Sequence, residues 1–294
     1  MTTPPPDGSR DRRIEDPTNL WIIHPAGRAL LPWAVEHRVS ANLVSVIGLC
    51  LGTMAAIAYG QWQDWRLAVV GLALSIGWLI ADGLDGMVAR ATGTASALGR
   101  ILDGVCDHGV FILIYVVIAS SIGTGEAWAW ALGAGAVHIV QSSLYEGERA
   151  RFHRRARGLP RGAVPAPSRN PVVWAYDRLA TGIDRVAVPF DRLFEYRALA
   201  PALSAAYAAR AIWPMRLMIL LAANIRVYAI FLACFWGDPR WFWWFELVPL
   251  SIVAAIGLAW HRQVEVSLFR QFAADVPAPA SPLFSVQSKD INQQ

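Results

Sequence analysis

The chain has few charged residues: Asp, Glu, Lys and Arg make up 16% of its 294 residues. Because a soluble domain usually carries about 25% charged residues, the composition disfavours a soluble fold. Lysine is almost absent, since Lys289 is the only one. The three cysteines, Cys50, Cys106 and Cys234, all fall in apolar stretches, so we expect apolar packing and no disulfide framework. The polar, Pro-rich stretch from Met1 to Pro17 contains no apolar core, so no cleavable signal peptide is expected.

Apolar residues are abundant instead, at 55% of the chain, and they include 14 tryptophans. A helix that crosses a bilayer needs about 20 predominantly apolar residues. Six stretches meet this requirement: 42–60, 67–90, 101–122, 127–146, 214–236 and 241–261. The sequence therefore predicts an all-α integral membrane protein with six transmembrane helices.

The parts of the chain outside these stretches differ in character. Residues 1–19 and 273–294 are predicted to be disordered, which leaves a membrane domain over residues 20–272. Residues 20–38 alternate apolar and basic positions, a pattern typical of an amphipathic segment at the membrane interface. Residues 147–212 are predicted to form a cytoplasmic insertion that begins as an Arg-rich, Pro-rich loop.

Positive charge indicates the orientation. Arginines cluster before the first stretch and after the fourth, whereas the connections on the other side hold little beyond Arg66 and Arg240. By the positive-inside rule, both termini and the insertion face the cytoplasm, as in a multi-pass protein of a plasma or inner membrane. The pI of about 9.2 is then explained by topology and by anionic lipid in the bilayer, and no nucleic-acid partner is expected.

Four carboxylates interrupt the second and third apolar stretches. Asp82 and Asp85 stand three residues apart, and Asp103 and Asp107 stand four apart. On helices, either spacing places both members of a pair on one face. Charged groups inside a membrane are costly, and four carboxylates cannot all stay ionised without counter-charge. The sequence therefore predicts a polar cavity facing the cytoplasm, with two divalent ions, Mg²⁺ or Mn²⁺, bound by the aspartates.

This pattern resembles the signature of the CDP-alcohol phosphotransferase family, D-x2-D-G-x2-A-R-x8-G-x3-D-x3-D. Every fixed position is met, by Asp82, Asp85, Gly86, Ala89, Arg90, Gly99, Asp103 and Asp107. The resemblance implies transfer of a phosphatidyl or other phospho-alcohol group from a CDP-linked lipid donor to a polar alcohol, with release of CMP, in phospholipid synthesis. It also suggests a homodimer.

The resemblance implies a role for each matching residue. Asp82, Asp85 and Asp103 would be metal ligands, and Asp107 would be the general base and a further metal contact. The residues that would line the CDP site are Asn42, Ser45, Gly86, Ala89, Arg90 and Gly99. Asn42 and Ser45 match a P-N-x-x-T-like stretch of the family only loosely, because Ala41 replaces the proline and Ser45 the threonine.

Two other functions use clustered intramembrane carboxylates. A transporter or ion pathway could hold them as a polar network, but it has no need for the interleaved glycines and arginine. An intramembrane prenyltransferase also has Asp-rich metal sites, but its two acidic motifs are expected far apart in sequence. Here only 18 residues separate Asp85 from Asp103.

The sequence also indicates an acceptor pocket, without identifying the acceptor. Arg226 lies ten residues past Arg216 in an apolar stretch, and so needs a buried anionic partner. That partner is either a motif carboxylate or a substrate phosphate, and the second alternative would favour an anionic acceptor.

A polar stripe recurs at helical spacing in the fourth stretch: His138, Gln141 or Ser142, Tyr145 and Arg149. These side chains are expected to face the interior of the bundle. They would serve either for hydrogen bonds between helices or for acceptor binding. The predicted acceptor-binding residues are therefore His138, Tyr145, Arg149 and Arg226.

Overall fold

The computed structural model describes residues 11–94, 97–161 and 188–275, with the backbone alone over 97–107. Every regular element in these ranges is a helix, and no strand occurs in them, which confirms the all-α prediction. The main helices are α1 (His24–Glu36), α2 (Ala41–Tyr59), α3 (Trp65–Ala91), α4 (Ala97–Ile122), α5 (Gly125–Ala156), α7 (Ala200–Met218), α8 (Ala223–Phe235), α9 (Arg240–Leu247) and α10 (Pro249–Phe272). Shorter turns are η1 (Arg12–Ile14), η2 (Asn19–Ile23), η3 (Leu193–Glu195), η4 (Ile219–Leu221) and η5 (Ala273–Asp275).

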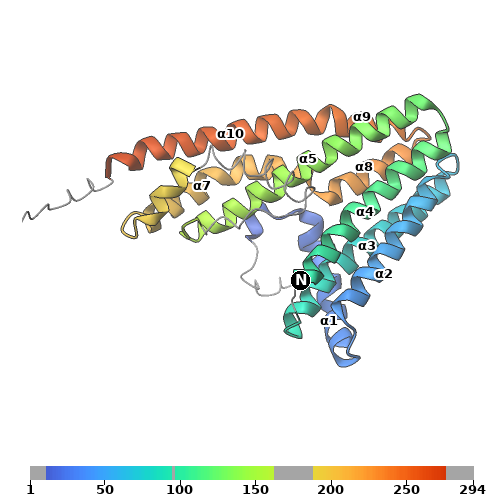
Figure 1. Cartoon of the computed structure of the whole chain (residues 1–294), viewed down its shortest axis with the longest axis horizontal. Coiled ribbons are helices and arrows are strands. Elements are labelled where there is room, and N and C mark those ends of the chain that lie inside the picture. The colour runs from blue at the N-terminus through green and yellow to red at the C-terminus, as the bar shows by residue number, and fades with distance from the viewer. Residues whose placement is uncertain (1–10, 95–96, 162–187, 276–294) are drawn as a thin grey trace, which may run out of the picture.

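The helices form two groups that share α5 (Figure 1). At one end, α2, α3 and α4 lie side by side, and α1 and α8 pack against α3. At the other end, α7 packs against α5 and against α10. The long helix α5 runs from the first group to the second, so its residues contribute to both.

Within the described residues, three helical segments are long and apolar enough to cross a membrane: Ala41–Tyr59, Trp65–Ala91 and Arg240–Phe272. A fourth is added if Ala200–Leu221 and Ala223–Phe235, which meet at a 41° bend, count as one broken span. Of α4, the part with described side chains contains a shorter apolar helix, His108–Ile122. These segments indicate a membrane protein, while the six-span layout stays a proposal.

The insertion does not begin as a loop after residue 146, because α5 continues as a helix to Ala156. This part of the prediction is wrong for a physical reason. Tyr145, Glu148, Phe152 and Arg155 recur three or four residues apart and are all buried, in contact with elements that include α7 and α10. The arginines that suggested a solvated loop therefore lie on a packed helix, and the loop can begin only at Arg157 or later.

The predicted span 214–236 is not one continuous helix. Helix α7 already contains Pro214, and the chain leaves helical geometry at Ala222, with φ −69° and ψ 153°, before α8 begins. The guanidinium of Arg226 donates from Nη1 to the carbonyl oxygen of Leu221 at this break, which satisfies an acceptor that the helix no longer uses. The last predicted span, 241–261, lies across α9 and α10, which together form one candidate span from Arg240 to Phe272.

The N-terminal prediction also needs correction, because residues 11–19 are ordered. Ile14 is fully buried in a hydrophobic cluster with side chains of α7. Asp16 accepts hydrogen bonds from the backbone of Thr18 at 2.7 Å and from the Asn224 side chain at 3.0 Å. One buried apolar side chain and one buried carboxylate thus hold a segment whose polar, Pro-rich composition suggested disorder.

Helices α2 and α4 approach closely at Gly52, which gives a stability prediction. A Cβ at this position would lie 2.7 and 3.0 Å from Cγ1 and Cβ of Val110, and closer still to Cγ2. Gly52→Ala should therefore force the helices apart and destabilise the protein by about 1–3 kcal/mol, the usual cost of overpacking. Gly133→Ala is the matched control, since its nearest neighbour would be 3.8 Å away. Thermal unfolding in detergent measures both, and equal melting temperatures would contradict the close approach.

Candidate functional site

The last turns of α3 carry the first half of the aspartate motif. Asp82, Asp85, Gly86 and Ala89 lie at three- or four-residue spacing, so they share one face of the helix. Arg90 folds back along this face, because its Nη1 lies 3.3 Å from where a Cβ on Gly86 would stand. The missing side chain of Gly86 therefore makes room for the Arg90 guanidinium on the helix face that carries the two aspartates, an arrangement suited to a phosphate group.

The side chain of Ser45 reaches this face from α2. Ser45 Oγ donates a hydrogen bond to Oδ2 of Asp85 at 2.5 Å, and both side chains are buried. Asn42, the other residue of the loosely matching stretch, is exposed at the start of α2. The structure therefore brings Ser45 to the motif and leaves Asn42 on the surface of the chain.

The second half of the motif lies on the first turns of α4. Gly99, Asp103 and Asp107 belong to the part of this helix whose side chains are outside the described residues. Helix α2 packs against both α3 and α4. The convergence of all four aspartates on one point thus stays a prediction, and the described half consists of Asp82 and Asp85.

The described half of the motif fits a divalent cation. Carboxylate oxygens are the hard ligands that Mg²⁺ and Mn²⁺ prefer, and Asp82 and Asp85 present them from one face of α3. Asp85 is only 6% exposed, a position where an ionised carboxylate needs counter-charge or hydrogen bonds. The hydroxyl of Ser45 supplies one such bond, and a bound cation would supply the charge.

Arg226 does not pair with a described motif aspartate; its partner is Glu246 on α9. The guanidinium Nε donates to Glu246 Oε1 at 2.9 Å, and Nη2 donates to Gln141 Oε1 at 2.9 Å. With Nη1 bound to the Leu221 carbonyl, Arg226 contacts three protein acceptors, and both Arg226 and Glu246 are 0% exposed. These contacts favour the structural alternative for Arg226, with Glu246 in place of a motif carboxylate.

The polar stripe of α5 faces inward, as predicted. His138, Gln141 and Tyr145 are all buried. His138 Nδ1 lies 3.3 Å from Glu246 Oε1, and the Gln141 amide donates to the Glu246 carbonyl oxygen at 3.1 Å. For His138 and Gln141 the stripe therefore makes hydrogen bonds between helices.

Tyr115 on α4 completes this buried cluster, because its hydroxyl donates to Glu246 Oε1 at 3.1 Å. Farther along α5, the Arg149 guanidinium lies over the ring of Tyr145, 5.8 Å from its centroid, and pairs with Glu146 at 3.1 Å. Tyr145 and Arg149 thus stand apart from the Glu246 cluster and remain candidates for acceptor binding.

A second buried cluster joins α5 and α10, and α7 contacts it through the Tyr207 hydroxyl, 2.7 Å from His261 Nε2. Glu148, His261 and Glu265 bring their ligand atoms within 4.8 Å of one another, a spacing that a metal ion could use. However, Glu148 also accepts from Arg151 at 2.7 Å, and the guanidinium of Arg262 contacts both glutamates. Because guanidinium groups already supply the positive charge, the cluster does not fit a cation and instead joins three helices.

Nearby positive charges lower the pKa of Glu148 and that of Asp191, two carboxylates that lie outside the candidate membrane spans. Burial would raise the pKa of Glu148, but His261, Arg262 and Arg151 outweigh it and lower the pKa to about 2. Burial would likewise raise the pKa of Asp191, but Arg155 and Arg154 hold that pKa below its usual value. Both carboxylates therefore stay ionised at neutral pH and serve as ion-pair partners.

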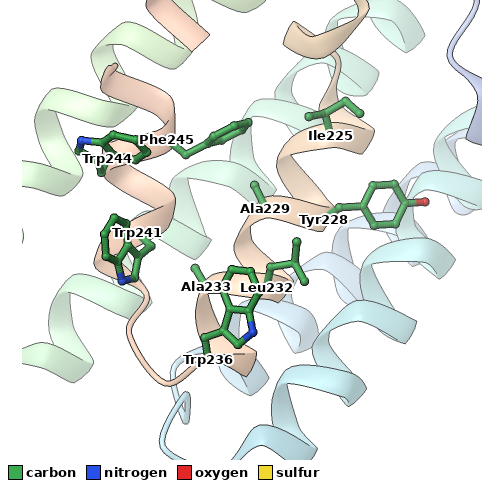
Figure 2. Close-up of a pocket in the computed structure, with 9 residues that line it drawn as sticks. All are labelled: Ile225, Tyr228, Ala229, Leu232, Ala233, Trp236, Trp241, Trp244 and Phe245. Carbon is green, nitrogen blue, oxygen red and sulfur yellow. The ribbon is translucent and has the colours of Figure 1, made fainter. Parts of the chain in front are cut away.

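One apolar pocket lies between α8 and α9 (Figure 2). Its volume is about 320 Å³, and its lining residues are Ile225, Tyr228, Ala229, Leu232, Ala233, Trp236, Trp241, Trp244 and Phe245. Phe235, at the same end of α8, packs against Trp65 at the start of α3, with ring centroids 5.9 Å apart. Asp82 lies about 25 Å further along α3. This end of the pocket is therefore remote from the motif, and the lining offers no charged group for a phosphate.

Sequence reasoning missed two features that the tertiary structure shows to be central. Glu246 is a lone carboxylate in the apolar run that begins at Trp241, and an intramembrane acid is itself a signal that a partner exists. His261 and Glu265 stand four residues apart at the end of the last predicted span, where one helical face carries both. The signals were present, but neither identified the partners.

Comparisons with known proteins agree with the motif. Residues 38–161 match the family model described as CDP-alcohol phosphatidyltransferase. Cholinephosphotransferase 1 of Gallus gallus is 31% identical over 124 residues, covering 35% of this chain and 37% of the relative. Phosphatidylinositol phosphate synthase of Mycobacteroides abscessus is 29% identical over 125 residues, covering 42% of this chain and 49% of the relative.

Ethanolaminephosphotransferase 1 of Pongo abelii is 23% identical over 125 residues, covering 38% of this chain and 31% of the relative. The chain thus spans between about a third and a half of the length of these curated relatives. No solved structure gives a significant match to the chain.

Proposed function

We propose that the chain is a membrane transferase of phospholipid synthesis, on the premise that residues 38–161 match the CDP-alcohol phosphatidyltransferase family model. It moves a phosphatidyl or other phospho-alcohol group from a CDP-linked donor, CDP-diacylglycerol in the first instance, to a hydroxyl acceptor. The observation that carries this proposal is the face of α3 on which Asp82, Asp85, Gly86, Ala89 and Arg90 follow the family signature within the matched residues.

In the proposed reaction, the oxygen of the acceptor attacks the β-phosphorus of the donor, the bond to the α-phosphate oxygen breaks, and CMP leaves. Asp82, Asp85 and Asp103 would hold two Mg²⁺ or Mn²⁺ ions, which neutralise charge on the diphosphate when bound. Asp107 would take the proton of the acceptor hydroxyl. Arg90, beside Gly86, would contact the phosphates of the donor.

The proposed topology has six membrane spans, with the motif and both termini on the cytoplasmic side and a polar cavity open to the cytoplasm. The apolar segments of α2, α3 and α9–α10 support a membrane location. The arginines that precede α2 and those at the C-terminal part of α5 support the orientation. A homodimer is part of the same proposal and rests on the family resemblance.

The acceptor is proposed to be a polar alcohol that enters beside α5. The names of the relatives refer to three different alcohols, choline, inositol and ethanolamine, so the family match does not select one. Tyr145 and Arg149 are the proposed acceptor contacts, because the side chains of His138 and Arg226 already contact Glu246.

A direct test offers the purified protein CDP-diacylglycerol, Mn²⁺ or Mg²⁺ and a panel of alcohols: inositol phosphate, glycerol phosphate, serine and inositol. A second arm offers diacylglycerol with CDP-choline or CDP-ethanolamine. Mass spectrometry identifies the lipid product, and CMP is measured in parallel. We expect one acceptor to give a new lipid with stoichiometric CMP. No CMP release with any donor and acceptor, from folded protein, would contradict the proposed function.

Asp107→Asn should distinguish a role of Asp107 as general base from a role as metal ligand. Asn keeps the size of the side chain but cannot take a proton, so turnover should fall by about a hundred- to ten-thousand-fold. Affinity for the CDP donor, measured by equilibrium binding in the presence of Mn²⁺, should stay near that of the parent. If donor affinity collapses as completely as in Asp82→Ala, Asp107 is chiefly a metal ligand and its role as base is wrong.

A further inference from the structure

The hydrogen bond between Ser45 and Asp85 joins two helices at the centre of the motif. Ser45 is 7% exposed and Asp85 is 6% exposed, and they belong to α2 and α3, which pack against each other along their length. Ser45 Oγ lies 2.5 Å from Asp85 Oδ2 and 3.2 Å from the carbonyl oxygen of Ala41. The hydroxyl thus has two acceptors within reach, and the carboxylate is the nearer.

The chemistry of the pair determines the direction of this bond. An ionised carboxylate has no proton to donate, so the single proton of the Ser45 hydroxyl goes to Asp85. Hydrogen bonds from a hydroxyl to a carboxylate are short and about twice as strong as bonds between neutral groups. One oxygen of Asp85 is therefore held in place, and the plane of its carboxylate is restrained.

We propose that Ser45 is a positioning residue that acts through Asp85 on metal binding and does not contact the CDP donor. This inference rests on the proposed function, because it takes Asp85 as a metal ligand. It also revises the role that the family resemblance implies for Ser45, which is contact with CDP. A ligand carboxylate that is oriented before the metal arrives loses less freedom when it binds.

The position of Ser45 in α2 fixes its hydroxyl next to the carboxylate of Asp85. Helix α2 begins one turn earlier, where the Ser40 side chain caps it by accepting from the backbone N–H of Leu43 at 3.2 Å. The α2–α3 packing holds Ser45 opposite Asp85, and alanine at this position removes the hydroxyl that contacts the carboxylate. Loss of such an outer partner typically weakens metal binding or activity by about 10- to 100-fold.

The test measures Mn²⁺ binding to the full chain in detergent, by electron paramagnetic resonance, with Mn²⁺ alone as the probe. We expect the Kd for Mn²⁺ to rise by about 10- to 100-fold in Ser45→Ala. Ser45→Thr keeps a hydroxyl and should restore most of the affinity. In the transfer assay, Ser45→Ala should regain kcat at saturating Mn²⁺, with KM for the CDP donor unchanged.

Ser75→Ala is the matched control, since Ser75 is also buried between α2 and α3, where its hydroxyl lies 3.3 Å from that of Tyr59. Mn²⁺ affinity should not change in this variant. An equal loss in Ser75→Ala would overturn the inference, because any buried hydroxyl would then have the same effect. A raised donor KM in Ser45→Ala with unchanged Mn²⁺ affinity would also overturn it, and would place Ser45 in the CDP site.

Asp82→Ala, measured alongside, distinguishes this inference from the proposed function. If the parent binds Mn²⁺ and Asp82→Ala does not, the metal site stands and the Ser45 variants decide the inference alone. If Asp82→Ala binds Mn²⁺ as the parent does, the aspartate motif is no metal site, and the proposed function fails together with the inference.

Discussion

Replacement of Asp82 with alanine is expected to abolish CMP release while the protein still inserts and folds. Asp82 shares a face of α3 with Asp85, and the proposed reaction requires both carboxylates to hold the cations that neutralise the diphosphate. Removal of one such source of electrostatic stabilisation typically lowers the rate by about a hundred- to a thousand-fold, and loss of a metal ligand should reach at least this range. The measurement is CMP release with CDP-diacylglycerol and the productive acceptor.

Asp64→Ala is a suitable control, because Asp64 caps the opposite end of the same helix and accepts from the backbone N–H of Arg66. This variant should lose some stability and keep its activity. Excess EDTA should inactivate the parent, and added Mn²⁺ should restore it. Full activity in EDTA, or an Asp82→Ala variant as active as Asp64→Ala, would rule out the proposed two-metal mechanism.

Arg226→Gln is expected to cause a large loss of stability. The guanidinium is fully buried and pairs with Glu246 at 2.9 Å, so its removal leaves a buried carboxylate without its main counter-charge. Breaking a buried ion pair from one side typically costs about 3–5 kcal/mol. The variant also loses the bond to the Leu221 carbonyl, where the chain breaks between α7 and α8. Thermal unfolding in detergent provides the measurement.

A double-mutant cycle with Glu246→Gln tests whether the loss of stability comes from the Arg226–Glu246 ion pair. The double variant should lose clearly less than the sum of the two single losses, because each single change already breaks the pair. Arg240→Gln is the control: Arg240 pairs with Asp238 at the surface, and its loss should leave the melting temperature unchanged. If Arg226→Gln keeps its stability but raises the acceptor KM, Arg226 is an acceptor contact and the structural role is wrong.

The sequence alone was enough to predict the helical class, the membrane character and the aspartate motif. Long apolar runs have few alternatives to helices in a bilayer, because every backbone polar group must be satisfied within the segment. For this reason the first two predicted stretches, 42–60 and 67–90, agree closely with α2 and α3. The motif was equally readable, since its chemistry depends on residue types at fixed spacing along one helix face.

The predictions failed where partners distant in sequence determine the structure. Residues 11–19 read as disordered because nothing local shows that Ile14 is buried against α7. Residues 147–156 read as a loop because nothing local shows that Arg155 meets Asp191 and Glu265 in ion pairs. A polar or charged segment stays in solvent unless another part of the chain forms hydrogen bonds or ion pairs with it. The local sequence pattern does not show which part of the chain that is.

The same reason separates what the sequence determined about the site from what the tertiary structure decided. Spacing placed Asp82 and Asp85 on one helix face, and the intramembrane depth of Arg226 required an anion. Only the packing of α2 on α3 brought the Ser45 hydroxyl to Asp85. Only the packing around α8 and α9 made Glu246 the partner of Arg226. Helical periodicity is local, whereas the pairing of buried charges depends on which helices meet.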